Sequence, residues 1–489
     1  MSLQARSNAA LIEWPDDEAD VSALALWDSA AIAAATGGKA SCAFQASGVE
    51  IDSRDVQPGD LFFALIGESM DGHRFVDMAL AKGAAAVIVD RPVAGPHVLV
   101  DDTFAALQAL ARAARDRSHA GVIGVTGSVG KTGVKEAIFA ALDRSSHGHA
   151  HRSVKSYNNH VGVPLSLSRM AGTAQFGVFE MGMNHAGEIA GLTAQVRPRV
   201  AVITTIAPAH IENLGSEEAI ADAKAEIFVG LERGGTAIIP ADSPHFARLR
   251  DAAVQCGAEV VSFGRAAHAD VRLLDTVAAY GGGSLVTADM GDRRLCYTVA
   301  APGDHWVDNS LAVMAAVRAV GGDLGAAGLA LAEMAGLKGR GAMQMIAAKG
   351  GEALLIDESY NANPASMQAT LRQLGATEAT RRIAVLGAMK ELGDHGPAFH
   401  AALAGPIAAA KVDYAVLVGD EMSTLAEELG KSAGPKLGKS VPFAHCQTPA
   451  DALAALAGFG VEHGDAILVK GSNSVGLGAV VAALADRKN

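Results

Sequence analysis

Short runs rich in valine and isoleucine alternate with alanine- and leucine-rich stretches of helical spacing along most of this chain of 489 residues. A run of four to eight apolar residues bounded by glycine or polar residues is typical of a strand that is buried on both faces. When such strands alternate with helices, the chain forms βαβ units around a largely parallel sheet. A single core usually holds about 100–200 residues. The pattern therefore predicts an α/β protein of several domains.

The strand-like runs fall into three blocks, with glycine-containing joints between them. The second block opens with the run GVIGVTG, and its later part, roughly residues 259–300, is rich in β-forming residues. The third block carries four strand candidates, ALLIDES, IAVLGAM, YAVLVG and AILVKGS. The predicted organisation is a flexible extension (1–23), a small N-terminal α/β domain (24–118), a central P-loop domain with a parallel sheet (119–336) and a C-terminal Rossmann-like domain (337–489).

Charge and composition exclude several classes of protein. The chain has 53 acidic and 40 basic residues, for a net charge of −13, which disfavours a nucleic-acid binder because phosphate neutralisation needs a basic surface. Its 50% hydrophobic content excludes a disordered chain. The four cysteines are scattered and form no CxxC pair, which fits a reducing compartment. Because we find neither a signal peptide nor an apolar run of about 18–20 residues, we expect a cytoplasmic protein that does not insert into a membrane.

A glycine-rich turn, TGSVGKT, lies between a predicted strand and a predicted helix. In that context backbone N–H groups encircle a polyphosphate. Lys131 is placed to neutralise β- and γ-phosphate oxygens, and the Thr132 hydroxyl to bind Mg²⁺. A turn that binds nothing is the alternative, but GKT between a strand and a helix is specific. The predicted nucleotide-binding residues of this turn are Thr126, Gly127, Ser128, Val129, Gly130, Lys131, Thr132 and Gly133.

Three further residues of the central block carry charge or metal-binding groups. Glu180 ends a predicted strand, His210 follows another, and Lys224 lies on a predicted amphipathic helix. The carboxyl ends of parallel strands meet at one edge of a sheet, so we expect Glu180 and His210 near the phosphate loop. Each residue alone is more often an ordinary surface group. Together with the loop they favour a catalytic site.

Nine motifs follow one another in a characteristic order: GSVGKT, YNNHVGVPL, EMGMNHAGEI, PAHIENLGS, DAKAEIFVGL, NSLA, DESYNANPASM, LGAMKELG and VKGSNSVGL. From about residue 24 to its end, the chain resembles the Mur ligase family. The resemblance implies an ATP-dependent ligase that converts a substrate carboxylate into an acyl phosphate and then joins it to an amine. YNANP and NNHVGVPL resemble the members that add D-alanyl-D-alanine to UDP-N-acetylmuramoyl-tripeptide during synthesis of peptidoglycan precursors.

The resemblance also implies roles for the central residues. Lys131 would bind the β- and γ-phosphates, while Thr132 and Glu180 would hold one Mg²⁺. His210 would help to hold a second Mg²⁺. Lys224 matches a lysine that several relatives carbamylate, and the added carboxylate would ligate or support that second ion. The implied catalytic set is Lys131, Glu180, His210 and Lys224, the implied metal set is Thr132, Glu180, His210 and Lys224, and the cofactors are ATP and two Mg²⁺ ions.

Further contacts are implied in the flanking domains. The additional nucleotide contacts are Asn309, Arg340, Asp357 and Tyr360. The implied substrate contacts are Ser53, Arg54, Asp71 and His73 for the uridine diphosphate sugar, Asn158, Asn159 and His160 for the peptide, and Asn361 and Asn363 for the incoming amine. The DSR and DGH segments and residues 158–160 could instead form turns or a helix cap. Arg340 could be an ordinary surface arginine, and Pro364 is a typical helix start. The chain departs from the family at Trp306, where relatives often have asparagine.

Two other functions compete with this prediction. A folylpolyglutamate synthase or another Mur ligase would share the phosphate loop, but YNANP and the DSR and DGH motifs of the first block argue against them. A non-catalytic P-loop nucleotide-binding protein would not need the intact set of Lys131, Glu180 and Lys224. We therefore expect a monomeric enzyme that acts on small molecules.

Overall fold

The computed structural model describes residues 25–67, 70–209, 211–279, 283–334, 336–431 and 441–486. The predicted extension (1–23) and His210 lie outside these described residues. The chain divides into two compact units, of which the first ends at Ala109 and the second begins at Leu110. Within the described ranges, no helix is both long enough and apolar enough to cross a membrane.

The first unit contains a five-stranded sheet in the order β2-β7-β6-β5-β4, in which only β2 is antiparallel to its neighbour among the described strands. Its core is formed by residues such as Phe62, Val76 and Val87. Its elements are β1 (Trp27–Asp28), α1 (Ser29–Thr36), β2 (Lys39–Ala40), β3 (Gln45–Ala46), β4 (Gly48–Glu50), β5 (Asp60–Phe63), the 3₁₀ helix η1 (Gly72–Phe75), α2 (Val76–Ala81), β6 (Ala86–Val89), β7 (His97–Leu99) and α3 (Thr103–Asp116), which continues into the second unit.

The second unit opens with a sheet of nine described strands in the order β16-β15-β14-β13-β12-β11-β8-β10-β9. Strands β8 to β13 are parallel, and β14 to β16 form antiparallel pairs. The strands β13 to β16 lie in the region that the sequence predicted to be rich in β structure. The elements are β8 (Gly121–Thr126), α4 (Lys131–Ser145), β9 (Ala150–Arg152), α5 (Gly162–Ser168), β10 (Phe176–Glu180), α6 (Glu188–Val196), β11 (Val200–Ile203), α7 (Ile211–Leu214), α8 (Glu217–Ala225), η2 (Glu226–Gly230), β12 (Thr236–Pro240), α9 (Phe246–Gln255), β13 (Glu259–Gly264), β14 (Val271–Ala278), β15 (Ser284–Asp289), β16 (Arg294–Val299), α10 (Asp304–Ala319) and α11 (Leu324–Glu333).

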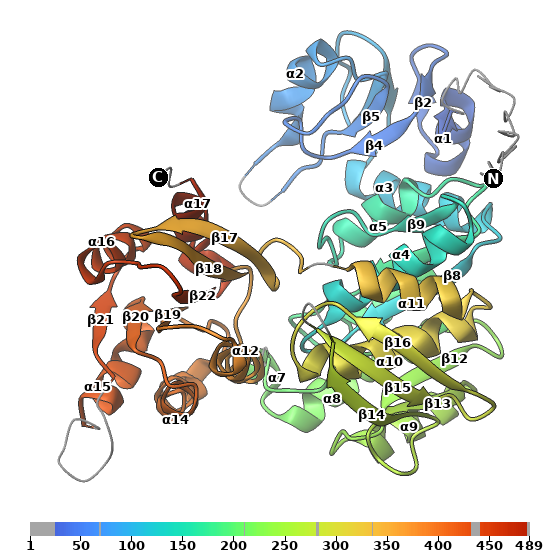
Figure 1. Ribbon diagram of the computed structural model, residues 1–489. Helices are drawn as coiled ribbons and strands as arrows, with labels where there is room; N and C mark the ends of the chain where they lie inside the picture. The colour runs from blue at the N-terminus through green and yellow to red at the C-terminus, as the bar shows by residue number, and fades with distance from the viewer. Residues whose placement is uncertain are drawn as a thin grey trace, which may run out of the picture. The chain divides into compact units, whose positions relative to one another are not determined.

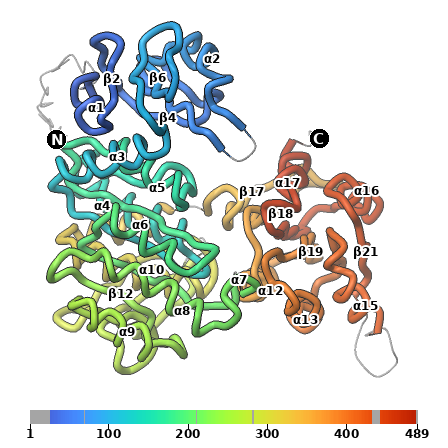
Figure 2. The backbone as a smooth tube through the Cα atoms, turned by 180° about the vertical axis from the view of Figure 1, so that it is seen from behind, coloured from blue at the N-terminus to red at the C-terminus, as the bar shows by residue number. Residues whose placement is uncertain are grey.

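Helices cover both faces of the central part of this sheet, which explains why a strand such as β11 is apolar and buried at every position. In β11, Val200 and Val202 face the layer of α4, α10 and α11, whereas Ala201 and Ile203 face the layer of α6, α8 and α9. Figures 1 and 2 show the two layers from opposite sides. The alternation follows from the two-residue period of a strand.

The second unit continues into a six-stranded sheet in the order β17-β18-β22-β19-β20-β21, counted over the part of the chain that is described. Only β17 pairs antiparallel among these described strands, so the Rossmann-like prediction agrees with the topology. Asn363 caps α12, whose first residue is Pro364, as predicted. The elements are β17 (Ala342–Ala348), β18 (Gly351–Glu358), α12 (Pro364–Ala376), β19 (Arg382–Gly387), η3 (Gly393–His395), α13 (Gly396–Ala401), α14 (Ala404–Ala409), β20 (Tyr414–Val418), η4 (Asp420–Met422), α15 (Ser423–Lys431), β21 (Phe443–Cys446), α16 (Pro449–Phe459), β22 (Ala466–Lys470), η5 (Asn473–Val475) and α17 (Gly478–Ala485).

The nine-stranded sheet has a topological switch point at β8, because β10 and β11 lie on its two sides. Thr126, at the end of β8, pairs with Ile203, and Glu180 at the end of β10 pairs with Val125. The three strand ends therefore share one edge of the sheet. Ligands of open α/β sheets bind at such an edge.

Candidate active site

The glycine-rich turn after β8 has a fixed backbone. Gly127 and Gly130 have φ values of 147° and 88°, which other residues rarely adopt. A Cβ atom on Gly127 would also lie 1.9 Å from the Thr204 hydroxyl. The Ser128 hydroxyl donates to the Ala207 carbonyl (2.8 Å), which ties the turn to the segment after β11. The turn therefore leads into α4 with the N–H groups of the first helical turn available for phosphate oxygens.

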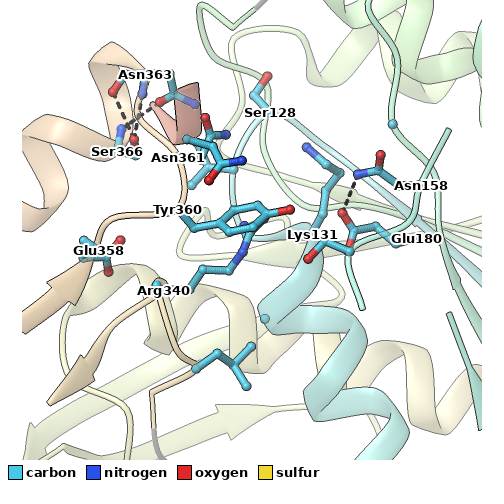
Figure 3. A pocket seen from close by; sticks show the side chains of 18 of the residues that line it. Ser128, Lys131, Asn158, Glu180, Arg340, Glu358, Tyr360, Asn361, Asn363 and Ser366 are labelled. Atoms are coloured by element: carbon cyan, nitrogen blue, oxygen red, sulfur yellow. Dashed lines mark hydrogen bonds between the residues drawn. The ribbon is translucent and has the colours of Figure 1, made fainter. Parts of the chain in front are cut away.

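A fully buried carboxylate lies beside this turn. The Thr132 hydroxyl donates to Glu180 Oε2 (2.8 Å), and the Asn158 side-chain amide donates to Glu180 Oε1 (2.7 Å). Each oxygen of Glu180 is thus held by a different side chain, which sets the plane of the carboxylate. Figure 3 shows the contact with Asn158. A hydroxyl and a carboxylate at this separation are hard oxygen ligands of the kind that Mg²⁺ prefers.

Three cationic side chains face the same region. Lys131 Nζ donates to the Gly127 carbonyl (2.6 Å); burial lowers its pKa, Glu180 opposes that shift and Arg340 adds to it. Lys224 is 2% exposed, and burial together with nearby Lys131 lowers its pKa well below the ordinary lysine value. The described residues offer Lys224 neither a hydrogen bond nor an ion pair. Converging positive charge in a buried site is suited to polyphosphate and carboxylate groups.

These residues line a cavity of about 330 Å³ within the second unit. Figure 3 shows Arg340 and Tyr360 on the side opposite Lys131 and Glu180, and the Arg340 guanidinium carbon lies 4.4 Å from the centre of the Tyr360 ring. The structure therefore brings together side chains from both sheets. The predicted residues that line the cavity are Ser128, Val129, Gly130, Lys131, Gly133, Asn158, Glu180, Lys224, Asn309, Arg340, Tyr360, Asn361 and Asn363.

Other predicted residues of the second unit have structural contacts instead. Asp357 accepts the Gly339 N–H (2.8 Å) and the Ser359 hydroxyl (2.6 Å), and the neighbouring Glu358 lines the cavity. Asn159 accepts the Gly162 N–H (2.9 Å) at the start of α5. The remaining predicted residues outside the cavity lining are Thr126, Gly127 and Thr132, which form the turn itself, and the exposed His160.

In the first unit, two predicted sugar-binding residues adjoin one another. Ser53 is buried. Arg54 forms an ion pair with Asp52 (2.6 Å), although 83% of its side chain is exposed. Such an exposed pair contributes little to stability, so the guanidinium can exchange this partner for another anion.

The other two predicted sugar-binding residues belong to a cluster of charges. His73 Nδ1 lies 2.7 Å from Asp71 Oδ1, and His73 Nε2 lies 3.1 Å from Asp90 Oδ1. The His73 backbone N–H and Arg91 hold the pKa of Asp71 well below its usual range. The His73 ring is therefore held in one orientation by the Asp71 carboxylate and by the Asp90 backbone N–H, which donates to Nε2 (3.2 Å). Its contact with a sugar nucleotide stays a prediction.

Four cavity-lining residues with ionisable side chains were absent from the predicted site: His305, Glu358, Glu391 and Lys470. Lys470 Nζ donates to the Asn361 carbonyl (2.9 Å) and contacts Glu358 Oε2 (3.3 Å), so it supports the loop after β18. Glu391 has a left-handed backbone with a φ of 64°. Except for His305, these residues end a strand of the six-stranded sheet or follow one closely. Ligands of open α/β sheets bind beyond the carboxyl ends of the strands. The sequence analysis used this rule for the second block, and its use for the third block would have found these three residues.

Sequence comparisons identify relatives of the whole chain. Residues 45–117 match the profile "Mur ligase family, catalytic domain", residues 125–317 "Mur ligase middle domain" and residues 341–473 "Mur ligase, glutamate ligase domain". The UDP-N-acetylmuramoyl-tripeptide–D-alanyl-D-alanine ligase of Synechocystis is 38% identical over 445 residues, which cover 88% of this chain and 90% of that protein. The chain belongs to the Mur ligase family. The motif resemblance is thereby confirmed.

Solved structures agree with this assignment. The crystal structure of MurF from Acinetobacter baumannii matches this Mur ligase with a TM-score of 0.80 at 29% identity, over 94% of this chain and 99% of that one. MurF from Thermotoga maritima, solved in complex with ADP, matches with a TM-score of 0.71 at 27% identity, over 89% and 96% of the two chains. The predicted α/β fold of the Mur ligase is confirmed.

Proposed function

We propose that this Mur ligase joins D-alanyl-D-alanine to UDP-N-acetylmuramoyl-tripeptide at the expense of ATP, as a step in the synthesis of peptidoglycan precursors. The observation that carries the proposal is the Thr132–Glu180 contact beside a phosphate loop with Lys131, at the switch point of the sheet. The named relatives supply the substrate class.

The charges of the cavity suit the two steps of such a reaction. The free carboxylate of the tripeptide attacks the γ-phosphorus of ATP, which gives an acyl phosphate and ADP. Two anions must approach one another, and Lys131 and Arg340 supply the opposing charge. The dipeptide amine then attacks the acyl carbon, loses a proton, and phosphate leaves as the new amide forms.

Thr132 and Glu180 fit one Mg²⁺ ion. Their oxygens are hard donors 2.8 Å apart, and phosphate oxygens and water would supply the other ligands of the ion. When bound, the ion would neutralise charge between the β- and γ-phosphates. Asn158 holds the second oxygen of Glu180 and so orients the carboxylate toward this task.

A second Mg²⁺ needs more ligands than the described residues present. Those residues contain no group of three or more histidine, cysteine, aspartate or glutamate side chains that could hold a metal. Carbamylation would turn Lys224 into a carboxylate, and His210, outside the described residues, would add a nitrogen. Burial lowers the pKa of Lys224, which favours the neutral amine that reacts with CO₂. We therefore propose a carbamylated Lys224 as the support of the second ion.

The remaining roles are proposed from the motifs. The first unit would bind the uridine diphosphate sugar through Ser53, Arg54, Asp71 and His73. The peptide would contact Asn158, Asn159 and His160, the incoming amine Asn361 and Asn363, and the nucleotide Asn309, Asp357 and Tyr360 as well as the loop. We propose that the enzyme works as a monomer.

Phosphate release from ATP tests the reaction. We expect release only when UDP-N-acetylmuramoyl-tripeptide and D-alanyl-D-alanine are both present, and no release from Lys131→Ala. Turnover with single amino acids but not with the dipeptide would indicate another Mur ligase, and turnover with a folate and glutamate would indicate a folylpolyglutamate synthase. Wild-type rates in Lys131→Ala would refute the loop assignment.

Carbamylation needs a separate test. Lys224→Ala should lose most activity, and short carboxylic acids should restore part of it by supplying the missing carboxylate. An unmodified Lys224 in an experimental structure determined with bicarbonate, together with no rescue, would rule out this role.

A further inference from the structure

Trp306 forms part of the cavity wall beside the phosphate loop. It is the third residue of α10, is 6% exposed, and lines the same cavity as Lys131 and Asn309. A second cavity, of about 240 Å³, is bordered by its neighbour His305 and again by Asn309. The indole therefore lies beside the loop and lines the first of these cavities, whereas the second cavity is lined by its neighbours on α10.

The indole packs so closely on α4 that it determines the residue at position 133. A Cβ atom on Gly133 would lie 2.7 Å from Trp306 Cη2 and 3.0 Å from Cζ2, closer than packed carbon atoms approach. The backbone of Gly133 is helical and has no positive φ that would itself require glycine. Glycine is a poor helix former, so this first turn gives up helix propensity to make room for the indole. The contact reaches the residue that follows Lys131 and Thr132.

The indole N–H has no acceptor among the described residues. The nitrogen is not among the fully buried polar atoms that lack a partner in the described residues, and its residue lines the cavity. Buried tryptophan N–H groups usually find a hydrogen-bond partner. A ligand of the cavity can supply it, because a nucleotide that occupies the phosphate loop carries ribose and α-phosphate oxygens next to the first turn of the helix.

We propose that Trp306 is a nucleotide-contacting residue in this Mur ligase. Its ring forms part of the wall of the cavity beside the phosphate loop, and its N–H donates to a ribose or α-phosphate oxygen of the bound nucleotide. Gly133 is its matched partner. The inference rests on the proposed function, because it takes the phosphate loop as the ATP site.

Tryptophan fluorescence tests the contact directly. The chain has three tryptophans, Trp14, Trp27 and Trp306, so few others contribute to the emission. Titration of the full-length protein with Mg-ADP should give a saturable emission change in the wild type and in the control Trp27→Phe, and none in Trp306→Phe. Calorimetry should show a Kd for Mg-ADP about 3- to 10-fold higher in Trp306→Phe, the effect of losing one neutral hydrogen bond. An unchanged Kd or a retained emission change in Trp306→Phe would overturn the contact, and 2′-deoxy-ADP distinguishes ribose from phosphate as acceptor.

A double-mutant cycle tests the pairing with Gly133. Gly133→Ala alone should raise the Kd for Mg-ADP by at least about 10-fold, but less than about 2-fold in the Trp306→Phe background, where the two clashing ring atoms are absent. Gly191→Ala is the control, since a Cβ there meets no atom within 4 Å. If Gly133→Ala does not fold, recovery of folding in the double variant supports the pairing, and failure to recover overturns it. Absence of Mg-ADP binding to the wild type would refute the proposed function itself, whereas wild-type binding without these dependences refutes only the role of Trp306.

Discussion

Replacing Asn158 by alanine should weaken the apparent affinity for Mg²⁺ by about 10- to 100-fold. Asn158 donates to Glu180 Oε1 at 2.7 Å, and without it Thr132 alone orients the buried carboxylate, through Oε2 at 2.8 Å. A hydrogen bond to a charged group contributes about 1.5–3 kcal/mol. At about 1.4 kcal/mol per factor of ten, this corresponds to roughly one to two orders of magnitude. Outer-shell partners of metal ligands have effects of the same size.

The assay is phosphate release at saturating ATP, nucleotide-peptide and dipeptide, with Mg²⁺ titrated. Excess Mg²⁺ should restore most of the rate of Asn158→Ala, because Glu180 and Thr132 are still present. Asp323→Ala is the matched control: Asp323 caps α11 through the Ala326 N–H (2.7 Å), so its loss costs about 1 kcal/mol of stability without touching the cavity. A wild-type Mg²⁺ midpoint in Asn158→Ala, or an equal shift in Asp323→Ala, would refute the assigned role of Asn158.

Three further outcomes are expected. Tyr360→Leu should raise the KM for ATP several-fold while Tyr360→Phe stays near the wild type, because only an aromatic ring stacks on Arg340 at 4.4 Å, a contact worth about 1 kcal/mol; equal values in steady-state kinetics would exclude the stack. Gly127→Ala should abolish ATP-dependent phosphate release, since its Cβ would lie 1.9 Å from the Thr204 hydroxyl; calorimetry that finds normal ATP binding would contradict this. Burial lowers the pKa of His151 to about 4, below the ordinary value of 6.5, so the folded state binds fewer protons than the unfolded state. The contribution of His151 to the free energy of unfolding is therefore fully present above about pH 6.5 and is lost as the pH falls toward 4, by ~2 kcal/mol at pH 5. In urea unfolding, the free energy of unfolding of His151→Gln should fall less between pH 7.5 and 5 than that of the wild type. An equal fall in both proteins would refute the assignment.

Local sequence signals were sufficient for the fold class and the phosphate loop. Apolar runs without alternation specify strands covered on both faces, and the glycine-rich turn before GKT specifies a backbone that few other sequences adopt. The rule for strand ends also placed Glu180 beside the loop, because parallel strands of one sheet end at a common edge. These features depend on backbone geometry within a few residues, or on the regular spacing of strands.

The sequence by itself therefore determined the α/β architecture, the turn that begins at Gly127 and the family. Only the tertiary structure decided that Glu358 lines the cavity while Asp357 binds its own loop, and that the indole of Trp306 leaves room only for glycine at position 133. The physical reason is the separation in sequence between the residues that interact. Backbone conformation follows from neighbours along the chain, whereas the direction of a side chain at a strand end and the atoms it meets are set by packing between segments that lie far apart in sequence.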